Sequence, residues 1–443
     1  PLPPRPSPSP AKQNIMTTQK PRLKMNTKPL PQDQLSCGLD FGTSNSVISI
    51  TDLSTRREVF TASLQSILYF PEAEPDACYV GRQAEEKYVA EAMKGRLLKS
   101  VKTLLKQDKF LFTWINGKKV TPDQMATHII RALKEQAEAY LGHPIRKVTL
   151  GRPAVFSEKE QEEKTAVARL LTAAHNAGFE EVHLQLEPIA AALSYEQHLQ
   201  HEETVLVADF GGGTSDFSIV SLAPQKAQQA DRSRDILAHG GLYIGGDLFD
   251  SEIMWHKVTP LLGRGVEYQS YGKKIEVPNS LYRELRNWER SFLLKDSKDR
   301  RMMDKYYVFS DNSPLIDNVR VLIDNNYVYS LFKEIERSKI ALSADDCSHL
   351  RFVKPRLELE TDLPYGDYRQ MTSLHIDAIS NYLEQMLAHS GFSPRQIDAV
   401  YMTGGSSLSR PIIDLMSRLF GAGSLRSGDT FHSVAHGLSL SRA

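Results

Sequence analysis

Two stretches of the chain repeat one pattern, and this repetition decides the predicted fold. The first is Cys37–Ile50, which reads CGLDFGTSNSVISI, and the second is Val205–Val220, which reads VLVADFGGGTSDFSIV. Each stretch runs from an apolar strand into Asp-Phe-Gly, passes through small hydroxyl residues and enters a second apolar strand. The two carboxylates, Asp40 and Asp209, are 169 residues apart. The sequence therefore predicts two similar domains facing one cleft, each contributing one turn and one carboxylate.

The residue types of the two turns predict phosphate chemistry. Glycine lets the backbone approach a ligand closely, and a tight turn aims several N–H groups at one anion. Thr43 and Thr214 add hydroxyl donors. A carboxylate repels phosphate but can hold Mg²⁺, usually through water. One such turn alone is also typical of an ordinary Asp-Gly hairpin, but two copies favour a clamp for a nucleoside triphosphate with Mg²⁺.

Composition narrows the class of protein. The chain has 443 residues, of which 41% are apolar and 24% are charged, as in soluble globular proteins. No apolar run approaches the roughly 18 residues of a membrane span. A net charge of zero favours neither nucleic acid nor an anionic membrane as a partner. The three scattered cysteines predict reduced thiols, without a metal site or disulfide framework, and a cytoplasmic location.

The first 32 residues differ from the rest in composition. They carry six Lys or Arg, no acidic residue and nine of the 23 prolines, so the remainder has 48 basic and 54 acidic residues. Such a segment cannot build a core, and we expect residues 1–34 to be a disordered basic tail. It is either upstream sequence, with Met16 or Met25 as the start, or a ligand for a proline-binding module.

Helical and strand patterns alternate along the rest, which predicts the α/β class. A cap at Thr121 with Pro122 in the first turn, and Gly142 at the end, bound one helix clearly. We expect residues 236–250 to be a glycine-rich connection and residues 264–330 to be the least readable part, with a Lys/Arg/Asp-rich charged turn after the helix expected at 279–294. The expected strands are 56–70, 147–150, 181–186, 350–360 and 397–403. The expected helices are 82–106, 121–141, 158–177, 189–200, 251–262, 279–294, 329–342, 371–390, 411–420 and 433–441.

Three further segments complete the set of motifs. Val400–Ser407 (VYMTGGSS) is a strand that ends in two glycines before a helix, which suits close approach to a sugar or phosphate. Gly245-Gly246-Asp247 is by itself simply a turn. Leu186–Tyr195 reads LEPIAAALSY.

Taken in order, these motifs resemble the actin-like ATPase superfamily. Within it, the chain looks most like the nucleotide-binding domain of the seventy-kilodalton heat-shock chaperones, whose Asn-Glu-Pro-Thr-Ala-Ala-Ala segment is similar to Leu186–Tyr195. The resemblance covers residues 36–440 and is weakest over 263–330. Gly151-Arg152-Pro153-Ala154, with no peptide-binding domain expected afterwards, resembles the short YegD-type branch. The resemblance implies an actin-like fold with two lobes and four subdomains: lobe I over 35–200, lobe II over 201–425, and a C-terminal helix in 426–443 returning to lobe I.

The resemblance also implies roles for individual residues. Lys102 matches the lysine that reaches the terminal phosphate, with Lys99, three residues away on the same helix face, as the alternative. The other roles are the first phosphate turn (Gly42, Thr43, Ser44), the second phosphate turn (Gly211, Gly212, Gly213, Thr214), Mg²⁺ (Asp40, Asp209), the attacking water (Glu187, Asp216), the nucleoside turn (Gly404, Gly405, Ser406), the adenine and ribose contacts (Glu336, Lys339, Ser343) and a further cofactor-binding turn (Gly245, Gly246). On spacing alone, Lys102 is equally a solvated lysine, and Glu336 and Lys339 are a surface pair.

Two departures concern the nucleobase. The family places arginines where Ile340 and Leu408 stand, and Arg410 could replace one of them after a two-residue shift. Base selectivity therefore stays open, whereas the phosphate residues are complete. We expect a weak, Mg²⁺-dependent ATPase that binds ATP and ADP as a chaperone-like switch, with protein clients or co-chaperones as partners. The alternatives are a nucleotide-sensing or filament-forming scaffold and a small-molecule kinase.

Overall fold

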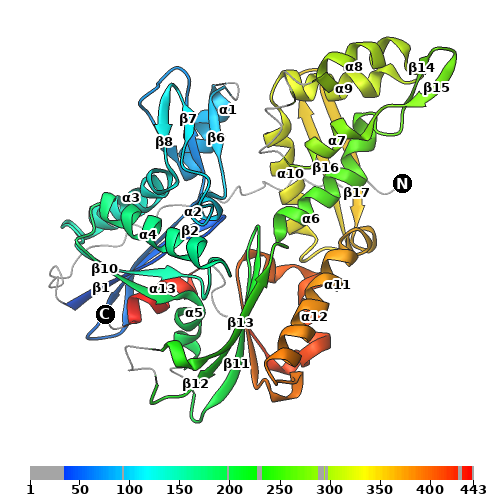
Figure 1. Cartoon of the computed structure of the whole chain (residues 1–443). Helices are drawn as coiled ribbons and strands as arrows, with labels where there is room; N and C mark the ends of the chain where they lie inside the picture. The colour runs from blue at the N-terminus through cyan, green and yellow to red at the C-terminus, as the bar shows by residue number, and fades with distance from the viewer. Residues whose placement is uncertain are drawn as a thin grey trace, which may run out of the picture.

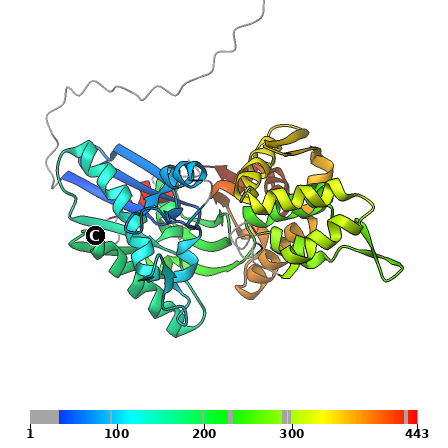
Figure 2. The ribbon, with the colours of Figure 1, turned by 90° about the horizontal axis from the view of Figure 1, so that it is seen from above.

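A computed structural model describes residues 34–91, 94–196, 199–226, 232–287, 294, 298–427 and 432–441. Apart from Gln34, the predicted basic tail lies outside these residues, as do 288–293 of the helix expected at 279–294. Two groups of elements stand side by side (Figures 1 and 2). We call residues 34–196 together with the last helix the N-terminal half, and residues 203–427 the C-terminal half. The domain boundaries near residues 200 and 425 stay a prediction.

Each half contains a five-stranded sheet, and the two sheets share one topology. The order of the first is β10-β9-β1-β2-β3 and that of the second is β13-β12-β11-β18-β19. In the first, β1, β2 and β3 are antiparallel neighbours, while β9 and β10 run parallel to β1. In the second, β11, β12 and β13 are antiparallel, while β18 and β19 run parallel to β11. The two predicted hairpins thus occupy equivalent places, and the α/β class is confirmed.

These strands include both predicted hairpins and the strands expected at 147–150, 181–186 and 397–403, whereas no strand was expected at β13 or β19. In the first sheet they are β1 (Leu35–Asp40), β2 (Asn45–Asp52), β3 (Arg57–Gln65), β9 (Lys147–Arg152) and β10 (Glu181–Leu186). In the second sheet they are β11 (Glu203–Phe210), β12 (Ser215–Leu222), β13 (Ile236–Leu242), β18 (Ala399–Thr403) and β19 (Leu425–Ser427).

The N-terminal half contains helices that cover its sheet and one small subdomain with short strands. The helix predicted from Thr121 is confirmed: the Thr121 side chain accepts from the Gln124 amide, and Gly142 ends the helix at a φ of +75°. The helices are α1 (Gly81–Ala90), α2 (Val101–Leu105), α3 (Pro122–Leu141), α4 (Glu160–Asn176), α5 (Glu187–Glu196) and α13 (Ser433–Leu440). The short strands are β4 (Leu68–Phe70), β5 (Tyr79–Val80), β6 (Arg96–Leu98), β7 (Thr113–Ile115) and β8 (Lys118–Val120).

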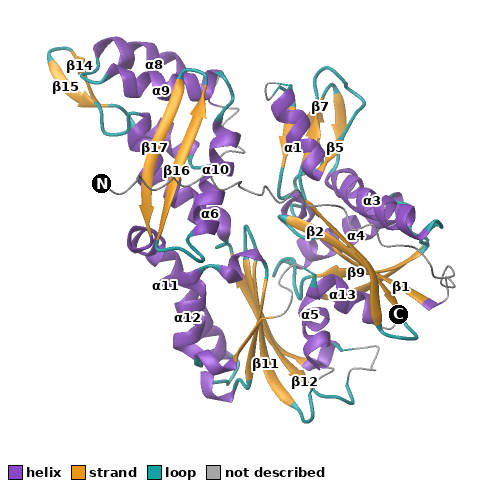
Figure 3. Ribbon diagram, turned by 180° about the vertical axis from the view of Figure 1, so that it is seen from behind, coloured by secondary structure: helices purple, strands orange, loops and turns teal. Residues whose placement is uncertain are grey.

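The C-terminal half continues beyond its sheet into a long arm (Figures 1 and 3). Helix α6 (Gly246–Ile253) runs on through a π-helical turn, Met254–Val258, and a 3-10 turn, Thr259–Leu262. The remaining elements are β14 (Glu267–Ser270), β15 (Lys273–Glu276), α7 (Asn279–Leu285), α8 (Lys298–Phe309), α9 (Ser313–Asp324), α10 (Val328–Ala341), β16 (Cys347–Lys354), β17 (Leu357–Pro364), α11 (Tyr365–His389) and α12 (Arg410–Phe420). None of the helices in the described part of the chain combines the length and apolar character that a membrane span requires.

Several local expectations are wrong where tertiary contacts override the local pattern. The expected helix 82–106 is interrupted, because β6 pairs with β4 and Ser100 adopts a left-handed φ of +59°. The expected connection 236–250 contains β13, which completes the second sheet. The expected strand 350–360 is part of a hairpin that turns at Arg356, where φ is +63°. The expected charged turn is the start of α8, and α9 follows it.

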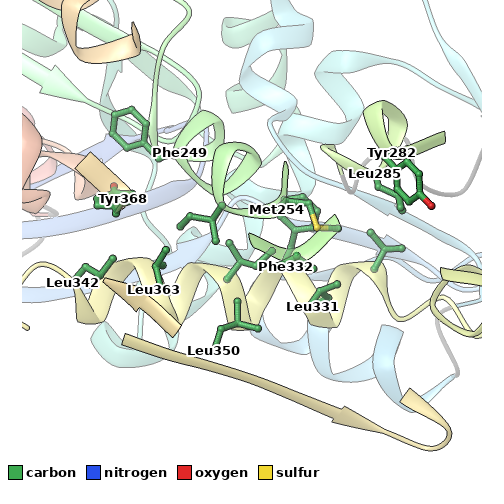
Figure 4. Close-up of a cluster of buried hydrophobic side chains, with 14 of the residues drawn as sticks. Phe249, Met254, Tyr282, Leu285, Leu331, Phe332, Leu342, Leu350, Leu363 and Tyr368 are labelled. Atoms are coloured by element: carbon green, nitrogen blue, oxygen red, sulfur yellow. The ribbon is translucent and has the colours of Figure 1, made fainter. Parts of the chain in front are cut away.

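Four buried apolar clusters hold the elements together within the described residues, and the smallest lies around Tyr69 of β4 and Ala84 of α1. The largest fills the C-terminal half, where α6, α10 and the hairpin β16–β17 contribute Phe249, Phe332 and Leu350 (Figure 4). A second lies between the first sheet and helices α3 and α4. The third joins the halves, because α5 and α13 meet strands β11, β12 and β18 there, with Ala190 and Leu438 among its members. The contact between the halves is therefore built around α5 and α13.

Glycine permits the close approach of α13 to its neighbours. A methyl group on Gly437 would overlap the carbonyl oxygen of Ala190 in α5, and one on Gly38 would overlap the backbone of α13 at Ala435 and Ser439. Both overlaps are with backbone atoms, which cannot rotate away. The helix is thus fitted between strand β1 and α5 without room for side chains at these points.

We expect Gly437→Ala to destabilise the protein by roughly 1–3 kcal/mol, the usual range for overpacking. The melting temperature should fall by about 2–4 °C for each kcal/mol. Gly366→Ala in α11 is the matched control, because nothing lies within 4 Å of the added methyl group, and it should leave the melting temperature unchanged or raise it. Equal melting curves for the two variants would show that α13 is not packed as described.

Candidate functional site

A cavity of about 700 Å³ lies between the halves, and most of the predicted site residues line it. Its wall includes residues of both Asp-Phe-Gly turns, the ends of α2, α6 and α10, and the Gly404-Gly405 turn. The predicted residues that line it are Asp40, Gly42, Thr43, Ser44, Lys102, Glu187, Asp209, Gly211, Gly212, Thr214, Asp216, Gly246, Glu336, Lys339, Ser343, Gly404, Gly405 and Ser406. The fold thus brings predicted residues from seven separate segments of the sequence to one place.

Gly213 and Gly245 are the predicted residues that do not line the cavity. A methyl group on Gly213 would come 3.8 Å from the Thr43 side chain, so this glycine faces the first turn. A methyl group on Gly245 would overlap the carbonyl of Gly212. Gly245 therefore stands behind the second turn, where it allows the start of α6 to approach.

The two turns touch each other directly. A methyl group on Gly212 would overlap the hydroxyl oxygen of Ser44, so glycine is needed where the turns meet. The Gly42 amide donates to Ser46 Oγ at 3.2 Å, and Ser66 Oγ donates to the Gly42 carbonyl at 2.8 Å. In the second turn, the Gly211 amide donates to the Thr214 carbonyl at 2.9 Å. Hydrogen bonds within each hairpin therefore fix the turns that form this wall.

The start of α6 and the Gly404 turn brace the second turn from behind. The amides of Gly246 and Asp247 donate to the carbonyls of Gly211 and Gly212 at 3.1 and 2.8 Å. Ser406 Oγ donates to the Gly211 carbonyl at 2.9 Å. Gly404 has a φ of +79°, and a methyl group there would overlap Asp209 Oδ1. These bonds use the turn's carbonyls rather than its amides.

Lys102 is the cation of the predicted catalytic group. Its Nζ donates to Glu187 Oε1 at 2.7 Å, and the two side chains are only 14% and 13% exposed. Burial lowers the pKa of Lys102, but the carboxylates of Glu187 and Asp40 outweigh burial and raise it above the ordinary value. Lys102 is therefore charged, and it is held to Glu187 rather than free.

The strand-end carboxylates carry an unfavourable charge. Burial, followed by repulsion from Glu187, raises the pKa of Asp40 to about 7. Burial, followed by repulsion from Asp216 and Glu187, raises the pKa of Asp209 to about 8. Thr214 Oγ1 donates to Asp216 at 2.8 Å, which ties that carboxylate to the second turn. Negative charge thus exceeds positive charge at this end of the cavity, as a site for a cation requires.

The donor set fits Mg²⁺ only together with other ligands. Within the part of the chain that the structure describes, no group of three or more His, Cys, Asp or Glu side chains is placed to hold a metal ion. Asp40 and Asp209 are hard oxygen donors of the kind that Mg²⁺ prefers, but Mg²⁺ needs six ligands and usually keeps several waters. An ion held by these two residues would complete its shell with water and phosphate oxygens.

The opposite end of the cavity lies against α10. Glu336, Lys339 and Ile340 line it from this helix, and Ser343 lines it from the turn that follows. Lys339 Nζ donates to Asp250 Oδ2 at 2.9 Å and to the Gly246 carbonyl at 3.0 Å. Ile340 is 61% exposed and Leu408 46% exposed, although both are apolar. Exposed apolar side chains at this place form a surface that the flat ring of a base can cover.

Arg410 does not take the place of the missing arginines. Its guanidinium lies 3.7 Å from the centre of the Tyr365 ring and donates to Asp346 at 2.9 Å. It is not among the residues that line the cavity. The two-residue shift considered from the sequence is therefore wrong for this conformation, because Arg410 begins α12 and points to the β17–α11 junction.

Sequence reasoning did not assign several residues of the cavity. Asp247 and Asp250 come from the first turns of α6, and Tyr329 and Lys333 from α10. The Gly245-Gly246-Asp247 pattern was a local indication for Asp247. Helix α10 begins at the edge of residues 263–330, where the resemblance to the family is weakest. Tyr329 and Lys333 both bond to Glu85 of α1, so they bridge the halves at the cavity's rim.

We expect Asp209→Asn to stabilise the protein at alkaline pH but not at acidic pH. With a pKa of about 8 instead of 3.8, folded Asp209 keeps a proton that the unfolded chain has released, so stability falls as pH rises through this window. The variant removes that loss. In thermal unfolding with EDTA, the melting temperature of Asp209→Asn should be roughly 2–8 °C above that of the parent at the alkaline end of the window. At the acidic end the two melting temperatures should be equal.

The exposed residue Asp377 provides the control, since Asp377→Asn should leave the pH dependence unchanged. A constant difference between Asp209→Asn and the parent at every pH would mean that the pKa of Asp209 is not raised in the folded protein.

Comparison with known proteins agrees with the geometry. A family model described as Hsp70 protein matches residues 78–265. The matched segment contains Lys102, Glu187, the second turn and the start of α6, whereas the first turn and Gly404-Gly405 lie outside it. With two mixed sheets of one topology around the cavity, the chain has the actin-like ATPase fold, and the match supports an Hsp70-like ATPase domain.

Proposed function

We propose that the chain binds ATP with Mg²⁺ in the cavity between its halves, hydrolyses it slowly and acts as a chaperone-like switch. The observation that carries the proposal is the meeting of both Asp-Phe-Gly turns with Lys102, Glu187 and Asp216 in one cavity. The amides and hydroxyls of the turns suit phosphate oxygens. A cavity of about 700 Å³ falls in the usual range for small-molecule sites.

Individual roles follow from this placement. Asp40 and Asp209 would hold Mg²⁺, which when bound neutralises phosphate charge. Lys102 would contribute its ammonium to the terminal phosphate, and Glu187, freed from Lys102, would orient the attacking water together with Asp216. Phosphoryl transfer passes through a loose transition state, so positioning and charge stabilisation supply most of the catalysis. Gly404, Gly405, Ser406 and, from α10 and the turn after it, Glu336, Lys339 and Ser343 would receive the nucleoside.

The useful output would be closure of the halves. A ligand that contacts both halves favours the closed state over the open state, to the extent that it binds the closed state more tightly. Protein clients or co-chaperones would respond to this change. Gly151-Arg152-Pro153 supports placement in the short YegD-type branch. Gly151 is crowded by Leu438 and Glu187, so α13, β9 and the water-orienting carboxylate are in contact there.

A nucleotide sensor with little turnover is the second candidate. The bond between Lys102 and Glu187 favours it, because each would act on the terminal phosphate only after releasing the other. Ile340 and Leu408 also leave the base end without the arginines of the family.

The decisive measurement is MgATP hydrolysis by the purified protein beside Lys102→Ala and Asp216→Asn. We expect slow turnover that falls at least about 100-fold in both variants, since each removes preorganised charge from the transition state. Lys164→Ala removes an exposed lysine that pairs with Glu160 in α4, and should leave turnover unchanged. Tight ATP binding without turnover would favour the sensor, and no binding of ATP would refute the proposal.

We further expect Ile340→Arg to tighten ATP binding by about fivefold, because a guanidinium can stack on the base. Titration calorimetry with MgATP measures this change. Ile413→Arg, in α12 and outside the cavity lining, is the control for added charge. Equal affinities in the parent and Ile340→Arg would place the base elsewhere.

A further inference from the structure

Lys99 joins the two halves across the phosphate end of the cavity. It lies between β6 and α2, and its Nζ is 3.0 Å from Oδ1 of Asp247 in the first turn of α6. Both residues line the cavity. The Lys99 side chain is 17% exposed and that of Asp247 is 42% exposed. The lysine is therefore largely withdrawn from solvent, while its partner stays accessible.

Asp247 helps to hold the second turn in place. Its amide donates to the Gly212 carbonyl at 2.8 Å. A methyl group on Gly212 would lie 3.5 Å from Asp247 Oδ1 and would overlap Ser44 Oγ. Ser44 Oγ is buried and has no hydrogen-bond partner among the residues that the structure describes. The ion pair thus stands at the meeting of the two turns, beside a polar atom that still lacks a partner.

The two lysines of this segment differ in how firmly they are held. The Lys102–Glu187 pair is buried on both sides, so separating it leaves two charges with little water. In the Lys99–Asp247 pair the carboxylate is accessible, so on separation Asp247 can turn to water and only the buried ammonium needs a new partner. Burial lowers the pKa of Lys99, but Asp247, Glu336 and Asp250 raise it above its ordinary value, so the ammonium is charged.

We propose that Lys99 is a second phosphate-binding lysine, and that a bound polyphosphate replaces the Asp247 carboxylate as its counter-ion. The inference rests on the proposed nucleotide function. Asp247 is then a competitor of the ligand: it occupies Lys99 and holds the halves together until phosphate arrives, and it then turns to solvent. Lys99 and Asp247 therefore affect affinity in opposite directions, which a purely structural ion pair would not do.

The test is calorimetric titration of the full chain with MgATP in the parent, Lys99→Met and Asp247→Asn. We expect Lys99→Met to weaken binding about tenfold, the cost of one charge-assisted contact, and Asp247→Asn to tighten it about threefold. Lys118→Met and Asp76→Asn make the same charge changes in an exposed ion pair outside the cavity, and should leave the affinity unchanged. Melting curves without nucleotide verify that each variant is folded, and Lys99→Gln replaces Lys99→Met should the latter not fold.

Weaker binding in both cavity variants would overturn the inference, because it would mark the pair as a structural bridge. Unchanged affinity in Lys99→Met would also overturn it while leaving the proposed function intact. Absence of MgATP binding in the parent would overturn both.

Discussion

The excess of negative charge at the ends of two equivalent strands is the constraint on which the cavity depends. Asp40 and Asp209 end β1 and β11, where burial, followed by repulsion from Glu187 and, for Asp209, also from Asp216, raises their pKa values. Lys102 offsets only part of this charge. A folded protein keeps such a cluster at a cost in stability, which is typical of sites whose charge a ligand completes. The arrangement suits a cation accompanied by phosphate.

The shared topology of the two sheets explains why these groups meet. Each sheet places its hairpin turn after the same strand, so two sheets joined through α5 and α13 bring their turns together. The joint combines the alanines of α5, such as Ala190, with larger side chains such as Tyr401 and Leu438, and glycines admit α13. It buries less apolar surface than the core within either half. Relative movement of the halves about this joint therefore costs less than disruption of either core.

The bridges over the cavity are polar and of modest strength. Glu85 meets Lys333 and Tyr329 at the rim, and Lys99 meets Asp247 beside the turns. Exposed or half-exposed ion pairs contribute little net free energy. A ligand in contact with both halves consequently has a large share in deciding how firmly they close. Of these bridges, the one at Lys99 lies closest to the turns.

The sequence by itself determined the two hairpins, the α/β class and the motifs that supply the predicted site residues, because the Asp-Phe-Gly-Thr turns and the Glu187 segment are patterns that lie within a few residues. It also fixed α3, whose cap and terminal glycine act within a few residues. Tertiary structure decided β6, β13 and the β16–β17 hairpin, since a strand exists only where a partner offers its hydrogen bonds. It likewise decided that Lys102 pairs with Glu187, Lys99 with Asp247 and Arg410 with Tyr365, because charges far apart in the chain choose partners only after the backbone has placed them.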